Sequence, residues 1–265
     1  MNIVETTNTE IEPHTIGQMQ ALAQSIDPSL PDDHILEQHI RGPKADFYLC
    51  YDQGELVGMQ SYRSYVCPTP FAPTPRPVLQ GLLTYKHPDA APSRLTRSMS
   101  RRHGRRFLGR AWMLQPWVAI AHTPNPRLYH QFQQFFPRVY PTLDGDAPQP
   151  VREFIRAQLP PGHALGVGLI DQGCGHLPAE ADISDRYRAQ YASRSERVNE
   201  LFFELGLLRR EGRRILLSNR QLYIIGVHEP WPTFRHQARQ LWLRRRGAQS
   251  SSAAQLAWSA RDRPC

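Results

Sequence analysis

Residues 83–106 read "LTYKHPDAAPSRLTRSMSRRHGRR", and the interpretation of the whole chain depends on this stretch. It begins as a β-strand, breaks at Pro88, and continues with Arg94, Arg97 and Arg101 at the spacing of one helix face. A helix N-terminus that follows a strand offers unpaired N–H groups and a positive dipole end to a phosphate. The charge pattern alone favours an ordinary exposed helix face, and a phosphate-binding junction is the alternative.

The segment upstream of this stretch predicts helices followed by a β-hairpin and a third strand. Residues 46–51 and 56–66 are rich in strand-forming residues and flank the polar turn "DQGE". The run "PVLQGLLTY" (77–85) predicts the third strand. The connector "CPTPFAPTPRP" is too rich in proline for a helix and predicts an extended loop. Before the hairpin, residues 14–41 predict a helix, a break at "DPSLPDD", and a second short helix.

The segment downstream predicts one buried strand, a helix, an insertion and the rest of the sheet. "PWVAIAHT" has the composition of a short buried strand, and Asn125 is a good N-cap for the helix that follows. Residues 193–206 predict a second helix, with Ser193 and Glu196 as a capping box. The stretch "RRILLSNRQLYIIGV" predicts either one long strand or a hairpin that turns at "SNRQ". This order of elements predicts an α/β or α+β fold with a mixed sheet.

The composition indicates a basic protein without a familiar nucleotide motif. The 265-residue chain has a formal net charge of +8, and its 32 basic residues are all arginine except Lys44 and Lys86. Arginine binds phosphate and carboxylate through paired hydrogen bonds, so the basic surface suits a nucleic acid, a membrane phosphate or an anionic co-substrate. No helix-turn-helix, RNA-recognition, zinc-finger, dinucleotide, P-loop or GxSxG pattern occurs. These absences do not favour a nucleic-acid partner or a hydrolase.

The cysteines and the N-terminus bear on the compartment. The four cysteines have no CxxC or zinc-module spacing: Cys50, Cys67, Cys174 and Cys265. We interpret them as free thiols of a reducing compartment. The N-terminus lacks a signal-peptide pattern, and no run approaches the roughly 18 apolar residues of a membrane span. We therefore expect a cytoplasmic protein without a transmembrane segment or a metal site, and we leave its oligomeric state open.

The order of these elements resembles the GNAT superfamily of acyl-CoA-dependent N-acyltransferases. In that family a hairpin precedes a long central strand, which ends in a segment like V-H-P-D/E-x-R-x-x-G-x-G/A. The segment "KHPDAAPSRLT" supplies His87, Pro88 and Asp89 at the matching places. A second block, "VAIAHTPNPRLYHQFQQFF", resembles the family's strand, asparagine and helix. The resemblance covers about residues 14–140, and residues 193–227 would complete the sheet.

The resemblance implies both a fold and an activity. The fold would be a mixed, mostly antiparallel central sheet flanked by helices. Residues 1–228 would form this domain, with an insertion near 141–192, and residues 229–265 would form a basic C-terminal appendage. The activity would be transfer of an acyl group from acyl-CoA, as acetyl-CoA or a longer thioester, to an amine of a small molecule or peptide.

The loop that would hold the pyrophosphate of coenzyme A departs from the family pattern. The family's arginine and two glycines correspond to Ala91, Arg94 and Thr96. Glycine lets the backbone approach a phosphate closely, whereas arginine and threonine do not. Side chains would replace this backbone contact, or the site is lost. The residues expected at the co-substrate are Tyr85, Lys86, Ser93, Arg94, Leu95, Thr96, Arg97 and Asn125.

The chemistry of acyl transfer selects the candidate catalytic residues. An amine that attacks a thioester needs a base, a polarised carbonyl and a proton for the departing sulfur. The candidate bases are His122, at the end of the buried strand, and His87, at the end of the central strand. In the family a tyrosine of the following helix protonates the sulfur. That place is Phe132 here, so the nearest phenol is Tyr129, one turn earlier.

Other functions remain open at this point. The altered loop would also suit a thioester on an acyl carrier protein, or a different reaction of such a substrate. A module that binds an anion or a partner without catalysis is the third hypothesis. The tail "FRHQARQLWLRRRG" predicts an amphipathic helix with Phe234, Ala238, Leu241 and Trp242 on one stripe. We expect this stripe to pack on the domain, with contact to a membrane surface or a nucleic acid as the alternatives.

Overall fold

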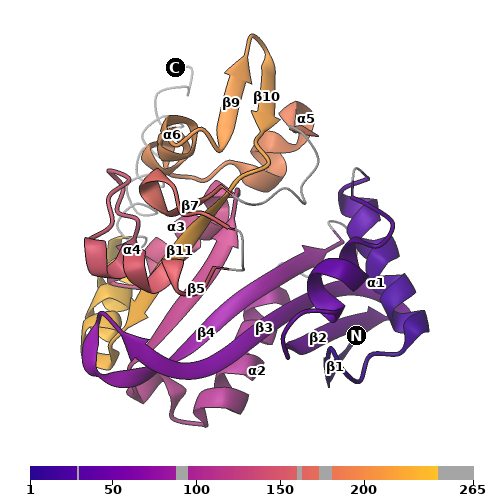
Figure 1. The fold of residues 1–265 in the computed structure, drawn as a ribbon, viewed down its shortest axis with the longest axis horizontal. Helices are drawn as coiled ribbons and strands as arrows, with labels where there is room; N and C mark the ends of the chain where they lie inside the picture. Colours follow the sequence, from indigo (N-terminus) through magenta and orange to yellow (C-terminus); the bar gives the residue numbers. More distant parts are fainter. Residues whose placement is uncertain (29, 88–94, 160–162, 173–180, 244–265) are drawn as a thin grey trace, which may run out of the picture.

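The computed structural model describes residues 1–28, 30–87, 95–159, 163–172 and 181–243 (Figure 1). The strands of its main sheet are β1 (Asn2–Thr7), β2 (Asp46–Asp52), β3 (Glu55–Thr69), β4 (Ala72–Lys86), β5 (Trp117–Thr123), β6 (Arg138–Tyr140), β7 (Ile170–Asp171) and β11 (Gln221–His228). Their order is β1-β2-β3-β4-β5-β11-β6, with β7 also paired to β11. Of the pairs in this described sheet, β4–β5 is parallel and the others are antiparallel. The predicted mixed, mostly antiparallel sheet is confirmed.

Helices flank this sheet, and a second sheet of short strands lies beside it. The longer helices are α1 (Pro13–Ile26), α2 (Leu95–Leu108), α3 (Pro126–Phe135), α4 (Gln149–Arg156) and α6 (Glu196–Glu204), and residues 230–243 are also helical. The shorter ones are η1 (Leu36–Ile40), η2 (Trp112–Leu114), η3 (Val167–Leu169), α5 (Ser184–Arg186) and η4 (Tyr187–Tyr191). The small sheet contains β8 (Ala181–Asp182), β9 (Leu208–Glu211) and β10 (Arg214–Leu217). No helix in the described part of the chain is long and apolar enough to cross a bilayer.

Both faces of the main sheet are covered, and β2 shows how. Successive side chains of a strand point to opposite faces. Phe47 and Leu49 accordingly join the cluster under α1, whereas Tyr48 and Cys50 join the cluster under α2. The two helices therefore lie on opposite faces. A strand buried on both faces needs a continuous apolar run, which is the pattern of "FYLCY".

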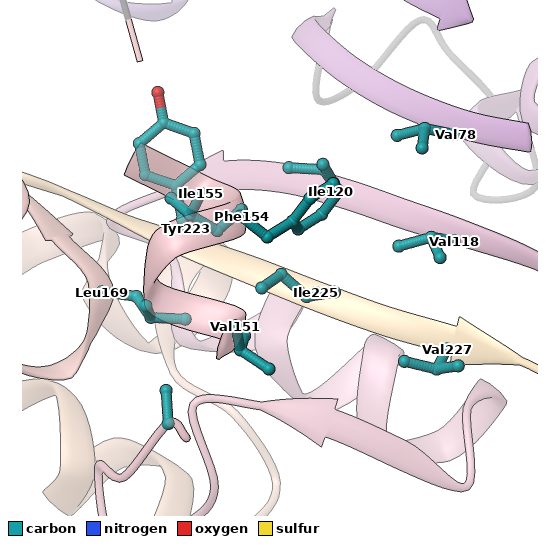
Figure 2. Close-up of a cluster of buried hydrophobic side chains, with 11 residues drawn as sticks. Val78, Val118, Ile120, Val151, Phe154, Ile155, Leu169, Tyr223, Ile225 and Val227 are labelled. Atoms are coloured by element: carbon teal, nitrogen blue, oxygen red, sulfur yellow. The ribbon is translucent and has the colours of Figure 1, made fainter. Parts of the chain in front are cut away.

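The half of the sheet around β5 and β11 has its own core. Figure 2 shows Val151 and Ile155 of α4 packed over Ile120 of β5 and Ile225 of β11. Each of these four side chains is at most 3% exposed. Full burial of such a side chain contributes about 1.5–3 kcal/mol to stability. This cluster fixes the position of β5, whose C-terminal end bears on function.

The proline-rich connector is strand rather than the predicted loop. β3 and β4 pair along nearly their whole length, from Gly58–Lys86 to Thr69–Ala72. The prediction was wrong because Pro73, Pro75 and Pro77 occupy alternate positions of β4. Their missing N–H groups all fall on one edge of the strand, so the other edge still pairs with β3.

Three other features of the fold differ from the sequence prediction: one strand, one hairpin and one connection. β1 was not predicted, because it is a polar edge strand that pairs with β2 and keeps Glu5 at its centre. β9 and β10 form a hairpin at Gly212, whose φ of 58° is in the left-handed region. β10 and β11 pair in different sheets, so "SNRQ" connects the two sheets and is not a hairpin turn.

The helix caps were predicted with mixed success. Asn125 is the N-cap of α3 and its side chain accepts a hydrogen bond from the N–H of Arg127, as predicted. The N-cap of α6 is Ser195 and not Ser193. The Ser193 hydroxyl instead accepts from the N–H of Ser195, one turn ahead of the helix. Gly206, with a φ of 68°, ends α6 as predicted.

A fully buried histidine fastens α2 to the sheet. His103 is stacked on the Tyr62 ring at 4.3 Å and hydrogen bonds to Tyr48 (3.2 Å) and Ser64 (2.6 Å). Burial, followed by the nearby charge of Arg106, lowers the pKa of His103 to about 4. The unfolded chain binds this proton near pH 6.5, so acid favours unfolding. Stability from this group is complete above about pH 6.5 and is lost as the pH falls towards 4.

This pH dependence is testable by denaturation. Between about pH 7 and pH 5, the His103 shift should lower the free energy of unfolding by about 2 kcal/mol. His103→Gln should be less stable near neutrality but should lose less stability over the same interval. Urea denaturation of both proteins at the two pH values measures the difference. An equal loss in the two proteins would show that His103 does not titrate in this way.

Candidate functional site

The parallel strands β4 and β5 separate early. Residues 78–81 of β4 pair with residues 118–121 of β5, and beyond them no pairing of the two strands occurs in the described residues. β4 nevertheless continues to Lys86. Between Gly81 and Leu83 its register with β3 shifts by one residue, which is a β-bulge. A bulge bends and twists its strand, and Figure 1 shows β4 and β5 pointing apart above this place.

The separation leaves hydrogen-bonding groups along one edge of β4. The N–H of His87 donates to the carbonyl of Val57 on β3 at 2.9 Å. In an antiparallel pair, alternate residues direct their N–H and C=O groups to opposite edges. The corresponding groups of Thr84 and Lys86 therefore face away from β3, on the edge where β5 has separated. An extended ligand that carries amide groups can pair with such an edge as an added strand would.

His122 lies at the end of β5, one residue beyond its last pair with β4. Its Nδ1 is buried and has no hydrogen-bond partner in the described structure. Desolvation lowers the pKa of His122, and nearby His163 lowers it further, while the charge of Asp171 opposes the shift. The ring is therefore neutral near neutral pH and has a nitrogen able to accept a proton. The Tyr223 ring lies 5.7 Å away and supports it from β11.

Asp171 and His163 form a second polar pair near His122. Asp171 is 2% exposed, and its carboxylate oxygens lie 2.9 and 3.1 Å from His163 Nδ1. Asp171 reaches this place because β7 pairs with the start of β11, where Gln221 is its partner. A buried carboxylate on a histidine nitrogen fixes the orientation of the ring. The pair can thus take part in proton transfer or attract a cationic group.

The connection between α1 and β2 approaches the same place from the β4 side. The Tyr85 hydroxyl, at the end of β4, is 3.2 Å from His34 Nε2. The rings of His34 and His39 are 5.4 Å apart. Burial, then His34 and then His122 lower the pKa of His39 to about 3. His39 is therefore close enough to His122 for their charges to interact across the separated strands.

The pKa of Tyr85 is affected by burial and also by Tyr191, a residue of η4. Burial is the main cause that raises the pKa of Tyr85, and Asp27 and Tyr191 add to it. The phenol consequently keeps its proton over the physiological range. Three parts of the chain thus surround the ends of β4 and β5: the α1–β2 connection, the β7 region and η4. Although histidines and an aspartate gather here, no three His, Cys, Asp or Glu residues of the described chain are arranged to hold a metal ion.

The structure places the three candidate catalytic residues in different surroundings. His122 lies near the end of β5, the buried strand on which it was expected, and this end is beside the strand separation, whereas His87 directly follows β4. Tyr129 is fully buried in the core with Phe202, and its hydroxyl donates to the Pro141 carbonyl at 2.7 Å. Burial raises its pKa, so the phenol keeps both its proton and this partner. Tyr129 therefore has a packing role, and we do not include it in the proposed chemistry.

The residues expected to bind the co-substrate fall into three groups: some lie on the β4 edge, some lie outside the described residues, and some lie at helix starts. Tyr85 and Lys86 lie on the edge described above, whereas Ser93 and Arg94 lie outside the described residues. Leu95, at the start of α2, is buried and packs against Gly58.

The remaining candidates lie at helix starts. Thr96 follows Leu95 in the first turn of α2, and its carbonyl accepts from the Ser100 hydroxyl. Arg97 is exposed on the same helix. Asn125 is committed to local structure, since its side chain caps α3 and also donates to the Gln190 carbonyl at 3.2 Å.

Sequence reasoning missed several residues of this site: His34, His39, His163, Asp171 and Tyr191. None lies in a motif, and each belongs to a connection or a very short element. The sequence signal for the three histidines is their residue type, because histidine is the side chain whose ordinary pKa lies nearest physiological pH. Their proximity depends on contacts between segments that are far apart in the chain.

Comparisons with known proteins gave matches among solved structures alone. No protein-family model and no curated protein matches the chain. Ribosomal-protein-alanine N-acetyltransferase from Brucella melitensis biovar Abortus 2308 is 19% identical, with 42% of this chain and 75% of that chain covered and a TM-score of 0.32. Aminoglycoside 6'-N-acetyltransferase from Enterococcus faecium is 12% identical, with 87% and 98% covered and a TM-score of 0.35.

A third solved structure is an acyl-CoA N-acyltransferase from Pseudomonas aeruginosa. It is 8% identical, with 51% of this chain and 86% of that chain covered and a TM-score of 0.34. The chain is thus similar, at low identity, to solved structures of N-acyltransferases. These identities and scores carry no conclusion about substrate or mechanism, which we argue from the residues above.

Proposed function

We propose that this chain is an acyltransferase that moves an acyl group from acyl-CoA to an amine of a small molecule or peptide. The observation that carries the proposal is the early separation of β4 and β5, with His122 at its edge. The separation provides a backbone edge for an extended thioester ligand. The neutral His122, with its buried Nδ1, provides a base beside it.

The described residues fit the co-substrate in part. The pantetheine arm of coenzyme A is extended and carries amides, which suits the N–H and C=O groups of Thr84 and Lys86. Its pyrophosphate needs positive charge or N–H donors, and the first turn of α2 with exposed Arg97 lies just beyond the end of β4. The fit supports acyl-CoA, and a carrier protein that bears the same arm is the alternative donor.

The reaction needs one proton to leave the amine and one to reach the sulfur. The attacking nitrogen forms a bond to the thioester carbonyl carbon, the carbon–sulfur bond breaks, and an amide and a free thiol result. His122 accepts the proton from the amine, directly or through a water molecule. Tyr85 lies at the end of β4 and keeps its proton, so its hydroxyl is the group that would supply a proton to the departing sulfur.

Calorimetric titration tests the donor. Acetyl-CoA and longer acyl-CoAs should each give saturable heat, and acyl-loaded carrier protein should give less. If only the acyl-loaded carrier protein gave saturable heat, the acyl donor would be the carrier protein and not acyl-CoA. No heat with any acyl-CoA would contradict the co-substrate half of the proposal.

The β4 edge has its own prediction. Thr84→Pro removes an N–H that does not pair with β3, so the sheet should persist while the bound arm loses one hydrogen bond. Because a hydrogen bond of this kind is worth about 0.5–1.5 kcal/mol, the Kd for acyl-CoA should rise by about twofold to tenfold. Thr84→Ala keeps the N–H and is the matched control. Equal Kd values for the two variants would rule out this edge as the binding surface.

A further inference from the structure

The helix at residues 230–243 is attached to the domain through its polar side. Thr233 is fully buried, and His236 Nε2 donates to the Gln133 carbonyl at 2.7 Å. Gln237 Nε2 donates to the Phe135 carbonyl at 3.5 Å. These residues lie three to four positions apart, on one helix face. The contacts satisfy carbonyls in the last turn of α3, and the helix is held in a defined orientation.

This orientation turns the apolar side of the helix outward. Trp231 is 60% exposed, Phe234 63% and Leu241 59%. The expectation that this stripe packs on the domain was therefore wrong. An amphipathic helix of a globular protein normally buries its apolar stripe and exposes its polar side. The reverse arrangement leaves aromatic and aliphatic side chains together on the outer face, which is typical of an interaction surface.

Arginine accompanies the apolar side chains on this face. The Arg235 guanidinium lies over the Trp231 ring, 5.0 Å from its centre, and Arg239 is exposed one turn later. Tryptophan, phenylalanine and leucine with flanking arginines are the side chains that bind the boundary between lipid headgroups and acyl chains. The arginines complement anionic headgroups in charge.

We propose that the apolar face of helix 230–243 docks this chain on an anionic phospholipid surface. The helix would lie in the plane of the surface, with Trp231, Phe234 and Leu241 inserted among the lipids and with Arg235 and Arg239 at the phosphates. Its polar side stays hydrogen-bonded to α3, so docking requires no unfolding. This inference does not depend on the proposed acyl transfer.

Vesicle sedimentation with the full chain tests the proposal. Wild-type protein should bind vesicles of phosphatidylglycerol and phosphatidylcholine, and should bind pure phosphatidylcholine at least about tenfold more weakly. Phe234→Glu combined with Leu241→Glu should reduce binding to the anionic vesicles by about tenfold or more. Val66→Glu combined with Leu114→Glu changes two other exposed apolar residues and should bind like the wild type.

Three results would overturn the proposal. The first is no binding of the wild type to anionic vesicles, and the second is equal loss of binding in the two double variants. The third is concentration-dependent self-association, abolished by the helix double variant, without any vesicle binding. That last result would assign the face to a second copy of the chain. Circular dichroism of both variants confirms that each remains folded.

Discussion

Replacing His122 by glutamine should lower kcat/KM for acyl transfer by about 100-fold to 10,000-fold, the usual contribution of a general base. Glutamine has nearly the size of histidine but cannot accept a proton from the amine. The binding of acyl-CoA should change little, since the proposed contacts of the co-substrate lie on β4. Steady-state kinetics, with calorimetry of both proteins, separates the two effects.

The pH profile sharpens this prediction. Burial lowers the pKa of His122, so the basic form persists to lower pH than an ordinary histidine allows. The wild-type kcat/KM should therefore rise with pH through an inflection below about 6.5. That inflection should disappear in His122→Gln. His14→Gln, on the exposed surface of α1, is the matched control and should behave as the wild type. Retained activity in His122→Gln with normal acyl-CoA binding would remove His122 from the mechanism.

Replacing Gly226 by valine should destabilise the chain by about 3 kcal/mol or more, at or above the upper end for overpacked cores. Gly226 lies in the middle of β11, directly under the Phe136 ring. A Cβ there would come 2.5 Å from Phe136 Cε2 and 2.6 Å from Cγ, and closer still to Cδ2. The ring cannot simply move away, because Phe136 is buried among Leu79, Trp117 and Ala119.

A second glycine provides the control. Gly17 is exposed on α1, and a Cβ there meets nothing within 4 Å. Gly17→Ala should therefore stabilise the chain by about 0.5–1 kcal/mol, because alanine loses less backbone entropy than glycine in a helix. Urea denaturation of both variants gives the two free-energy changes. If Gly226→Val unfolded with the wild-type midpoint, the packing of Phe136 described above would be wrong.

Local patterns predicted most of the elements of this fold. The apolar run of β5, the glycine turn between β2 and β3, and the N-cap Asn125 each act over a few neighbouring residues. Their physics is therefore present in a short window of sequence. The prediction failed where local composition and pairing disagree. The prolines of β4 are unfavourable for a sheet in general, but they are tolerated on the edge that faces away from β3.

The candidate site was predicted only in part, because local patterns record some of its residues and not others. His122 follows directly from its place at the end of a strand. Tyr129 was an equally plausible catalytic residue from its position in the helix sequence. A helix has several faces, however, and only the tertiary packing shows that the Tyr129 face is buried beside Phe202. His39 and Asp171 approach His122 through contacts between segments far apart in the chain, which no local pattern records.

The sequence by itself determined most of the segments that become strands and helices, because strand and helix periodicity are local properties of the chain. It also predicted an amphipathic helix in the tail "FRHQARQLWLRRRG" (234–247), and the described part of that tail lies within the helix at residues 230–243. Only the tertiary structure decided which side of that helix packs, since hydrogen bonds from His236 and Gln237 to α3 turn the apolar side outward. Only the tertiary structure decided where β4 leaves β5, because a bulge and its pairing partners set that point.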